Sequence, residues 1–301
     1  MRILHLDAGR QMRGGQWQVL RLLDGLKNEG VECVLLARAG APLFAAARDR
    51  GHVVEALSVP RVVLLARRFD LLHAHDSRTH TVGALIRPSA LLVSRRVAFP
   101  PRGAWKYAQP RHYLAVSAYV KQMLEAAGVP EAKISVVPDG VPLLEPAKGT
   151  ALVAPDYTAD PEKGSALAVE AAQMAGTEIR FSNDLERDLR GAALFVYITY
   201  QEGLGSGALM AMSAGVPVIA SRVGGLREII QHRETGILVD NRPEEIAAAI
   251  RELRENPPFA RRLGDAARQS VIDKYTVAHM VRRTMDVYRR MAGLPDSSMT
   301  A

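Results

Sequence analysis

The 301-residue chain has one cysteine, few aromatic residues and no long apolar run, and each shortage excludes a class of protein. Cys33 alone cannot form an intramolecular disulfide, which argues against a disulfide-stapled secreted domain and fits a reducing cytosol. No apolar run reaches the roughly 18 residues of a membrane span. The opening "MRILHLDAG" is too short and too polar for a signal peptide and resembles a first strand. We therefore expect a cytoplasmic globular protein, and its length favours two domains.

The net positive charge lies in the first half of the chain, because that half has few acidic residues. Residues 1–142 carry 20 Lys and Arg against 11 Asp and Glu, whereas residues 143–301 carry 19 against 21. This excess favours an anionic partner, such as phosphates or peripheral contact with the inner face of an acidic membrane, although a solvated arginine-rich surface explains it equally well. Aromatics make up only 5% of the chain and no basic run is interleaved with them. We therefore expect no nucleic-acid partner.

Short β-branched runs alternate with helix-length segments along the whole chain. This rhythm predicts βαβ units, and hence parallel sheets with helices on both faces. In the first half we expect strands over 2–8, 32–38, 52–57, 71–75, 91–97, 113–117 and 134–138, with helices over 15–28, 43–50, 79–86 and 118–127. In the second half we expect strands over 151–155, 178–182, 194–199, 216–221 and 236–240. We expect helices over 162–176 and 183–192, a short helix before the strand 216–221, and three final helices over 243–255, 258–274 and 276–291.

The proline-rich stretch "PDGVPLLEPAKGT" (138–150) interrupts this rhythm and predicts a linker between two domains. We place one domain over 1–142, a second over 143–275 and a C-terminal segment over 276–301. Two such α/β domains, each a doubly wound parallel sheet, are expected to face a cleft. In sheets of this kind, ligands bind at the carboxyl ends of the strands, where the strand order reverses.

Two motifs in the first half follow predicted strands. Gly14 and Gly15 in "DAGRQMRGGQW" open the first helix, where free amides suit an anion, although a tight turn explains the pair equally well. In "DLLHAHDSRTH", His73 and His75 share one face at a strand end, so a metal is one interpretation. Hydrogen bonding to a ligand is the interpretation that we favour, with His75 functional and His73 structural.

Two motifs in the second half suit a phosphorylated sugar. Lys163 lies at a helix start after a strand and could bind a diphosphate, although an ordinary solvated lysine is the simpler interpretation of that residue alone. The stretch "YITYQEGLGSGALMAMSAGVPVIAS" delivers Glu202 to the edge of the sheet, followed by a glycine-rich loop whose amides could hold phosphate oxygens. A carboxylate is badly placed for binding phosphate itself. Glu202 is therefore predicted to accept hydrogen bonds from sugar hydroxyls.

These motifs together resemble the group 1, family four retaining glycosyltransferases of the GT-B fold. Their signature is E-G-F-G-x-x-x-x-E-A-M-A-x-G-x-P-V-I-A, and here it reads "EGLGSGALMAMSAGVPVIA". The resemblance extends in order to "RGGQWQVLRLLDGL", "DLLHAHDS", "YLAVSAYVKQMLEAAGVPEAKISVVPDGV", "PEKG" and "GGLREIIQHRETGILVD". It covers nearly the whole chain and is most specific over 194–240.

The resemblance implies two Rossmann-like domains, with the donor on the second and the C-terminal helix packing back on the first, acceptor-side domain. The reaction would move a sugar from a nucleoside-diphosphate sugar to a glycan or lipid-linked hydroxyl with retention, without metal or other cofactor, in cell-envelope glycan or lipopolysaccharide synthesis. The implied catalytic residues are Glu202 and His75. The implied donor-binding residues are Gly14, Gly15, Lys163, Gly203, Leu204, Gly205, Ser206 and Met210.

Three departures weaken the implied donor site. Met210 stands where the family has a second glutamate for the ribose, and Tyr157 and Thr158 stand where it has an arginine. The second domain is also compact, because a strand and a helix before 178–182 are missing. A degenerate homologue that binds a ligand or partner without turnover is therefore the alternative. A GT-B epimerase or phosphorylase would share the architecture, but no feature supports one.

Overall fold

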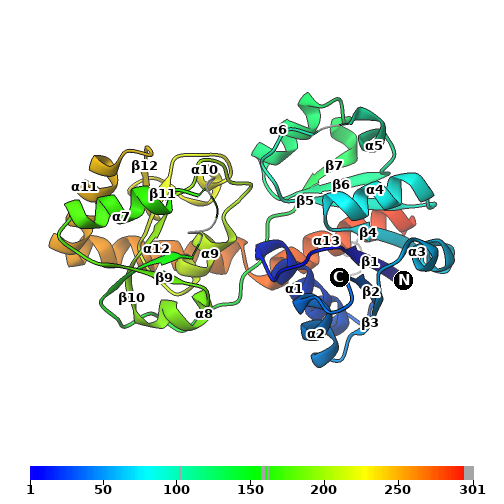
Figure 1. Ribbon diagram of the computed structural model, residues 1–301, viewed down its shortest axis with the longest axis horizontal. Coiled ribbons are helices and arrows are strands. Elements are labelled where there is room, and N and C mark those ends of the chain that lie inside the picture. Colours follow the sequence, from blue (N-terminus) through cyan, green and yellow to red (C-terminus); the bar gives the residue numbers. More distant parts are fainter. Residues whose placement is uncertain (102, 157–159, 161–162, 295–301) are drawn as a thin grey trace. The chain divides into compact units, whose positions relative to one another are not determined.

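The computed structural model describes residues 1–101, 103–156, 160 and 163–294. These residues form two compact units, one made by residues 1–140 with the C-terminal helix and the other by residues 141–276 (Figure 1). In the described part of the chain, none of the helices combines the length and apolar character that crossing a membrane requires.

Unit 1 is built on a seven-stranded parallel sheet of order β3-β2-β1-β4-β5-β6-β7. Its strands are β1 (Arg2–Asp7), β2 (Glu32–Ala37), β3 (Val53–Ala56), β4 (Leu71–Ala74), β5 (Leu91–Arg95), β6 (His112–Ala115) and β7 (Ile134–Val136). Its helices are α1 (Gly14–Asn28), α2 (Pro42–Asp49), α3 (Val59–Ala66), α4 (Ser77–Ile86), α5 (Ala104–Ala108), α6 (Ala118–Ala126) and α13 (Val277–Ala292), with one 3₁₀ turn (Glu131–Lys133). The order reverses between β1 and β4, the usual ligand position of a Rossmann sheet.

The helix α13 belongs to unit 1 although it ends the chain. It packs beside α1 (Figure 1) and shares a buried cluster with apolar residues of four strands, including Ile3, Leu71, Leu92 and Leu114. Right-handed crossovers place α1 and the helices after β4 on opposite faces of the sheet. The apolar residues of β4 to β6 on the α1 face therefore need another cover, and α13 supplies it.

Unit 2 is built on a five-stranded parallel sheet of order β12-β11-β10-β8-β9. Its strands are β8 (Ala151–Pro155), β9 (Ile179–Ser182), β10 (Ala192–Tyr197), β11 (Val218–Ser221) and β12 (Ile237–Val239). Its helices are α7 (Ser165–Met174), α8 (Leu185–Asp188), α9 (Ser206–Ser213), α10 (Leu226–Ile229), α11 (Pro243–Glu255) and α12 (Pro257–Lys274), with a 3₁₀ turn (Leu189–Gly191). This order reverses between β8 and β10, as in flavodoxin-like sheets.

Three short helices depart from the sequence-based expectation. The runs that form α3, α5 and α10 were not predicted as helices. The α3 run "VPRVVLLA" is rich in β-branched residues, which favours a strand. It is helical because the backbone amide of Arg61 donates to the Ser58 hydroxyl at its N-terminus, and a proline at its second position suits a first helical turn.

Candidate functional site

Unit 2 brings Lys163 and Glu202 together at the switch point of its sheet. Lys163 follows β8, and its backbone pairs with Thr199 just beyond β10. The Lys163 Nζ lies 3.0 Å from Glu202 Oε2, and their side chains are only 18% and 16% exposed. The two groups that are predicted to bind diphosphate and sugar therefore form an ion pair with each other.

Tyr197, which the sequence analysis did not single out, completes this cluster. Its hydroxyl donates to Glu202 Oε2 at 2.7 Å, and Lys163 Nζ lies 5.9 Å from its ring centroid. The amide of Gly203 donates to the other oxygen, Oε1, at 3.0 Å. Glu202 is thus oriented from three sides. The sequence pattern alone could not reveal this contact with Glu202. It places Tyr197 in a buried strand, as the structure does, and so marks it only as a core residue.

The glycine-rich loop after Glu202 leads directly into α9. Gly205 has φ of +104° and a Cβ there would meet Leu226 at 2.5 Å, so only glycine fits. Leu204 is buried, whereas Ser206, the first residue of α9, is half-buried. The amides of this first turn are therefore positioned for an anion.

Met210 lies in α9 one turn after Ser206 and is 6% exposed. The other departures from the family signature, at Tyr157 and Thr158, lie outside the described residues.

A hydrogen-bonded group holds the end of β10 in place. Thr199 donates its amide to Ser221 Oγ at 2.9 Å, Ser221 Oγ donates to Asn241 Oδ1 at 2.6 Å, and Asn241 Nδ2 donates to the Thr199 carbonyl at 3.0 Å. These residues follow or end three neighbouring strands. They fix the backbone three residues before Glu202, a role that no local sequence signal marks.

In unit 1, Gly14 and Gly15 begin α1 as predicted for a close backbone approach. Gly14 is exposed, and a Cβ added to Gly15 would meet nothing within 4 Å, so the space beside this helix start is open. The preceding loop is held by Asp7, which accepts from the Gly9 amide at 2.8 Å and from Gln16 Nε2 at 3.1 Å. Burial raises the pKa of the Asp7 carboxyl to about 6.

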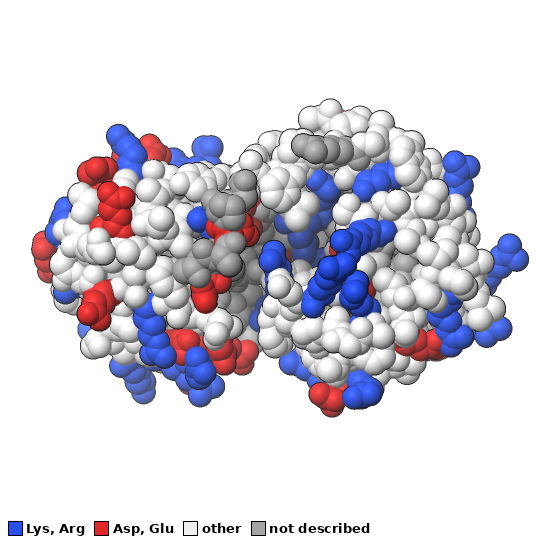
Figure 2. Space-filling view, in the orientation of Figure 1, with Lys and Arg blue, Asp and Glu red and all other residues white. Residues whose placement is uncertain are grey.

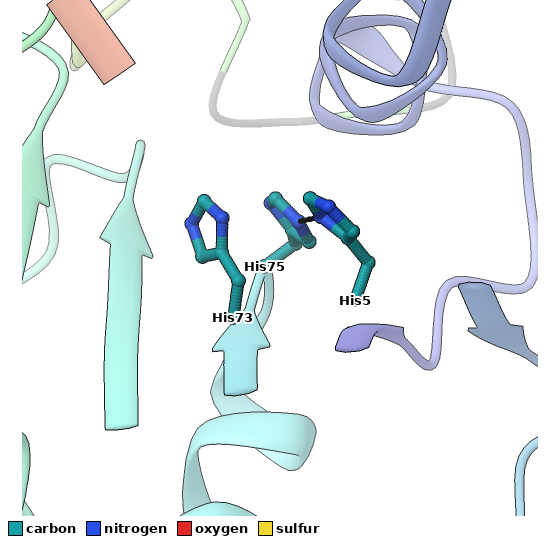
Figure 3. A group of neighbouring side chains, drawn as sticks. All are labelled: His5, His73 and His75. Carbon is teal, nitrogen blue, oxygen red and sulfur yellow. Dashed lines mark hydrogen bonds between the residues drawn. The ribbon is translucent and has the colours of Figure 1, made fainter. Parts of the chain in front are cut away.

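His75 lies at the other side of the same switch point, but it is buried with two further histidines. His73 and His75 come from β4 and its end, and His5 comes from β1 (Figure 3). His5 Nδ1 lies 2.9 Å from His75 Nε2, so one ring donates to the other. His73 bonds the Tyr288 hydroxyl at 2.6 Å and Ser94 Oγ at 2.8 Å. Both ring nitrogens of His73 thus have partners within the fold, which suits a structural residue. His75 is also buried, at 7% exposed.

Burial keeps these three histidines neutral at neutral pH. It lowers the pKa of His5 to about 3, with His52 adding to the effect, and it lowers the pKa values of His73 and His75 well below their usual value, with the neighbouring histidines and Arg96 adding to the effect. His75 can therefore act on a ligand as a hydrogen-bonding group and not as a cation.

The three rings are also close enough to be tested as a metal site, because one nitrogen of each lies within 4.8 Å of the others. Neutral imidazoles are good ligands. However, the His5–His75 contact is a direct hydrogen bond, and both nitrogens of His73 already have partners. Within the described residues, only His5 Nε2 and His75 Nδ1 of this cluster lack one. A metal would have to displace these hydrogen bonds, so the arrangement suits a structural cluster better.

Tyr288 offers a direct test of how this cluster stabilises unit 1. Replacing Tyr288 with Phe removes the partner of His73 Nδ1 and leaves that buried nitrogen unsatisfied. We expect a loss of about 1–3 kcal/mol in the free energy of unfolding. Both tryptophans, Trp17 and Trp105, lie in unit 1, so urea unfolding followed by tryptophan fluorescence reports on this unit. An unchanged free energy of unfolding in Tyr288→Phe would contradict the role of Tyr288.

Solved structures share this architecture. The structure of Anabaena Alr3699/HepE in complex with UDP-glucose matches with a TM-score of 0.86 at 16% identity, covering 96% of this chain and 100% of that chain. The sucrose-phosphate synthase of Thermosynechococcus elongatus matches with a TM-score of 0.80 at 18% identity, covering 97% and 99%. At such identities the likeness establishes the fold, which is GT-B.

Sequence comparison adds the family. Residues 12–143 match the family described as Glycosyltransferase Family 4, and residues 161–270 match Glycosyl transferases group 1. The chain is 32% identical over 170 residues to the D-inositol 3-phosphate glycosyltransferase of Nocardioides sp., covering 54% of this chain and 36% of that protein. It is 34% identical over 111 residues to the alpha-maltose-1-phosphate synthase of Mycolicibacterium smegmatis, covering 35% and 29%. The aligned parts thus span about a third of these relatives. The chain belongs to the group 1, family 4 glycosyltransferases.

Proposed function

We propose that this protein transfers a sugar from a nucleoside-diphosphate sugar to a hydroxyl of a glycan or lipid-linked acceptor, with retention of configuration and without a metal, in the synthesis of a cell-surface glycan or glycolipid. The observation that carries the proposal is the Lys163–Glu202 pair beside the glycine loop and the start of α9. No D-x-D sequence occurs in the chain, which fits a donor site that uses its own cations and amides.

In this proposal the donor separates the ion pair. The diphosphate takes the place of the Glu202 carboxylate beside Lys163 Nζ and the amides of Gly205 and Ser206. Glu202, still held by Tyr197 and Gly203, accepts hydrogen bonds from the sugar hydroxyls. The bond between the anomeric carbon and the phosphate oxygen breaks, the acceptor oxygen bonds to that carbon, and the acceptor proton passes to the departing diphosphate. Fixed positive charge and amides at the leaving group supply the main catalytic effect.

Unit 1 would supply the remaining contacts. Gly14 and Gly15 give a ligand room at the start of α1, and His75 is the hydrogen-bonding group proposed for the transferred sugar. His75 Nδ1 is buried and lacks a hydrogen-bond partner in the described part of the chain, so this contact requires a local movement that exposes the atom.

A thermal-shift panel tests the donor. UDP, GDP, ADP and CMP, alone and as common sugar conjugates, should separate by base, because a ligand at about 100 times its dissociation constant adds roughly 2.7 kcal/mol. We propose UDP as the nucleotide of the donor, since the Anabaena neighbour was solved with UDP-glucose. A clear shift with one base supports a donor site. No shift with any of them would favour the second candidate, a homologue without turnover.

Met210 is the observation that favours the second candidate. A buried thioether cannot replace the carboxylate that the family signature has at this position, so ribose binding should be weakened. We expect Met210→Glu to tighten UDP binding about tenfold, as one charged hydrogen bond is worth roughly 1.5–3 kcal/mol. Isothermal titration measures this, with Met210→Gln as the uncharged control and a smaller expected gain. Weaker binding in both variants would mean that Met210 is only a core residue.

A further inference from the structure

A long acid-free segment runs through unit 1. Residues 77–124 contain eight Lys and Arg and no Asp or Glu, whereas 48 residues at the chain's average composition would hold about five acids. The segment runs from the start of α4 through β5, α5 and β6 into α6. Most of the net positive charge of the first half therefore lies in one run of consecutive elements.

Several cations of this segment face solvent without a carboxylate. Arg78, Arg87 and Arg111 are exposed, and none of them forms an ion pair in the part of the chain that the structure describes. By contrast, Arg96 pairs with Asp139 at 3.0 Å, and Lys121 pairs with glutamates outside the segment. The three exposed arginines are thus available to an external anion.

Large apolar side chains are exposed in the same segment. Phe99 is 51% exposed and Trp105 49%, in the loop after β5 and in α5, with Val97 at 45% and Leu85 on α4 at 68%. Exposure of this much apolar surface beside arginines is unfavourable in water. It is typical of side chains at a membrane interface.

Hydrogen bonds join the loop after β5, the helix α5 and the first turns of α4. The Arg95 guanidinium donates to the Phe99 carbonyl and, at 2.9 Å, to the Tyr107 hydroxyl, which joins the loop to α5. Lys106 Nζ of α5 donates to the Ser77 and Thr81 hydroxyls of α4 at 3.0 and 3.4 Å. Leu85 follows these two residues at intervals of four and so lies on the same face of α4.

We propose that the surface formed by Leu85, Val97, Phe99 and Trp105 with the cations Arg78, Arg87, Lys106 and Arg111 docks unit 1 on an anionic membrane. The aromatic and aliphatic side chains enter the headgroup layer while the arginines contact lipid phosphates. On the visible face of unit 1 as a whole, Figure 2 shows more Lys and Arg than Asp and Glu surface, in line with the net positive charge of the first half. Docking would bring a lipid-linked acceptor to the acceptor-side unit of the proposed transferase.

Vesicle co-sedimentation tests the charge. The protein should bind vesicles in which about a third of the lipid is phosphatidylglycerol, bind pure phosphatidylcholine vesicles at least about tenfold more weakly, and lose the difference in about 0.5 M salt. Arg87→Gln with Arg111→Gln should weaken binding about 30-fold, because each cation near an anionic surface contributes roughly fivefold. The control pair, Arg38→Gln with Arg261→Gln, removes two exposed arginines elsewhere and should leave binding unchanged.

The two tryptophans allow insertion to be measured directly. In a Trp17→Phe background, Trp105 is the sole reporter, and its emission should move to shorter wavelength on phosphatidylglycerol vesicles. In the reciprocal Trp105→Phe variant, Trp17 should show no such shift. An unshifted Trp105, or equal binding to both vesicle types, would overturn the proposal.

One outcome separates a membrane from a small anion. If excess glycerol phosphate removes the protein from vesicles, the surface is a site for soluble anions and membrane docking is wrong. The readout is also independent of turnover. Glu202→Gln, which abolishes transfer under the proposed function, should bind vesicles like the unsubstituted protein, so failure of either proposal is seen separately.

Discussion

Glu202→Gln is expected to lower the kcat/KM of sugar transfer by at least about 100-fold while leaving the fold intact. Glutamine has nearly the same shape, and its carbonyl oxygen can still accept from the Tyr197 hydroxyl. Its NH2 group only donates, so it cannot accept from a sugar hydroxyl. Each charged hydrogen bond that is lost is worth roughly 1.5–3 kcal/mol, and two of them give about 100-fold or more. The assay is transfer from whichever nucleotide sugar the thermal-shift panel selects.

Two controls make this result specific to the site. Glu255→Gln changes an exposed glutamate at the end of α11 in the same unit and should transfer normally. UDP alone should still raise the melting temperature of Glu202→Gln, since the proposed contacts of Glu202 are to the sugar. Transfer within about threefold of the unsubstituted enzyme would falsify the assignment, because it corresponds to less than one charged hydrogen bond.

Unit 1 is expected to lose at least about 3 kcal/mol of stability between pH 7.5 and pH 5.5. His5, His73 and His75 stay neutral in the folded state because burial lowers their pKa values. The unfolded chain takes up a proton on each below about pH 6.5, so stability falls by about 1.4 kcal/mol per histidine in total between pH 7.5 and pH 5.5. Their contribution is fully present above the unfolded pKa and declines until the folded pKa, about 3 for His5, is reached.

Asp7 opposes this loss. Its folded pKa of about 6 means that the folded state binds a proton below pH 6 that the unfolded state does not bind, which returns about 1 kcal/mol at pH 5.5. His80 and His112, whose pKa values burial lowers to about 4, act in the same direction as the three histidines. The net sign is therefore a loss on acidification.

Urea unfolding followed by tryptophan fluorescence at several pH values measures this slope. His5→Gln removes one titrating group and should reduce the loss between pH 7.5 and pH 5.5 by about 1.4 kcal/mol. The slope should persist in about 0.5 M salt, because desolvation is the main cause and salt screens only charge–charge terms. A free energy of unfolding that stays flat from pH 7.5 to 5.5 would show that the histidines are not buried as described.

Local patterns were enough to predict the kind of fold. The alternation of β-branched runs with helix-length segments predicted parallel sheets, and the GT-B fold confirms this. The α3 run was the instructive exception, because its β-branched residues favour a strand, and a serine cap with proline in the first turn outweighs that preference. Propensity is a weak local energy, and tertiary context can reverse it.

Local patterns also carried part of the site. A glutamate at a strand end followed by glycines predicted a loop for a sugar phosphate, and Lys163 lies 3.0 Å from that glutamate. The catalytic and donor-binding roles stay predictions until the variants are measured. Tyr197 could not be predicted as the partner of Glu202, because the geometry of the turn after β10 decides where its hydroxyl lies.

The sequence by itself determined the strand ends at which chemistry is placed, since backbone preference, glycine and hydrophobic period act between near neighbours in the chain. Only the tertiary structure decided which strand ends meet. The order β3-β2-β1-β4 in unit 1 brings His5 beside His75, 70 residues later, and places the predicted ligand contact in a buried, neutral, hydrogen-bonded cluster. Burial and pairing depend on groups distant in sequence, and these desolvation and hydrogen-bond energies fix the charge state of each residue.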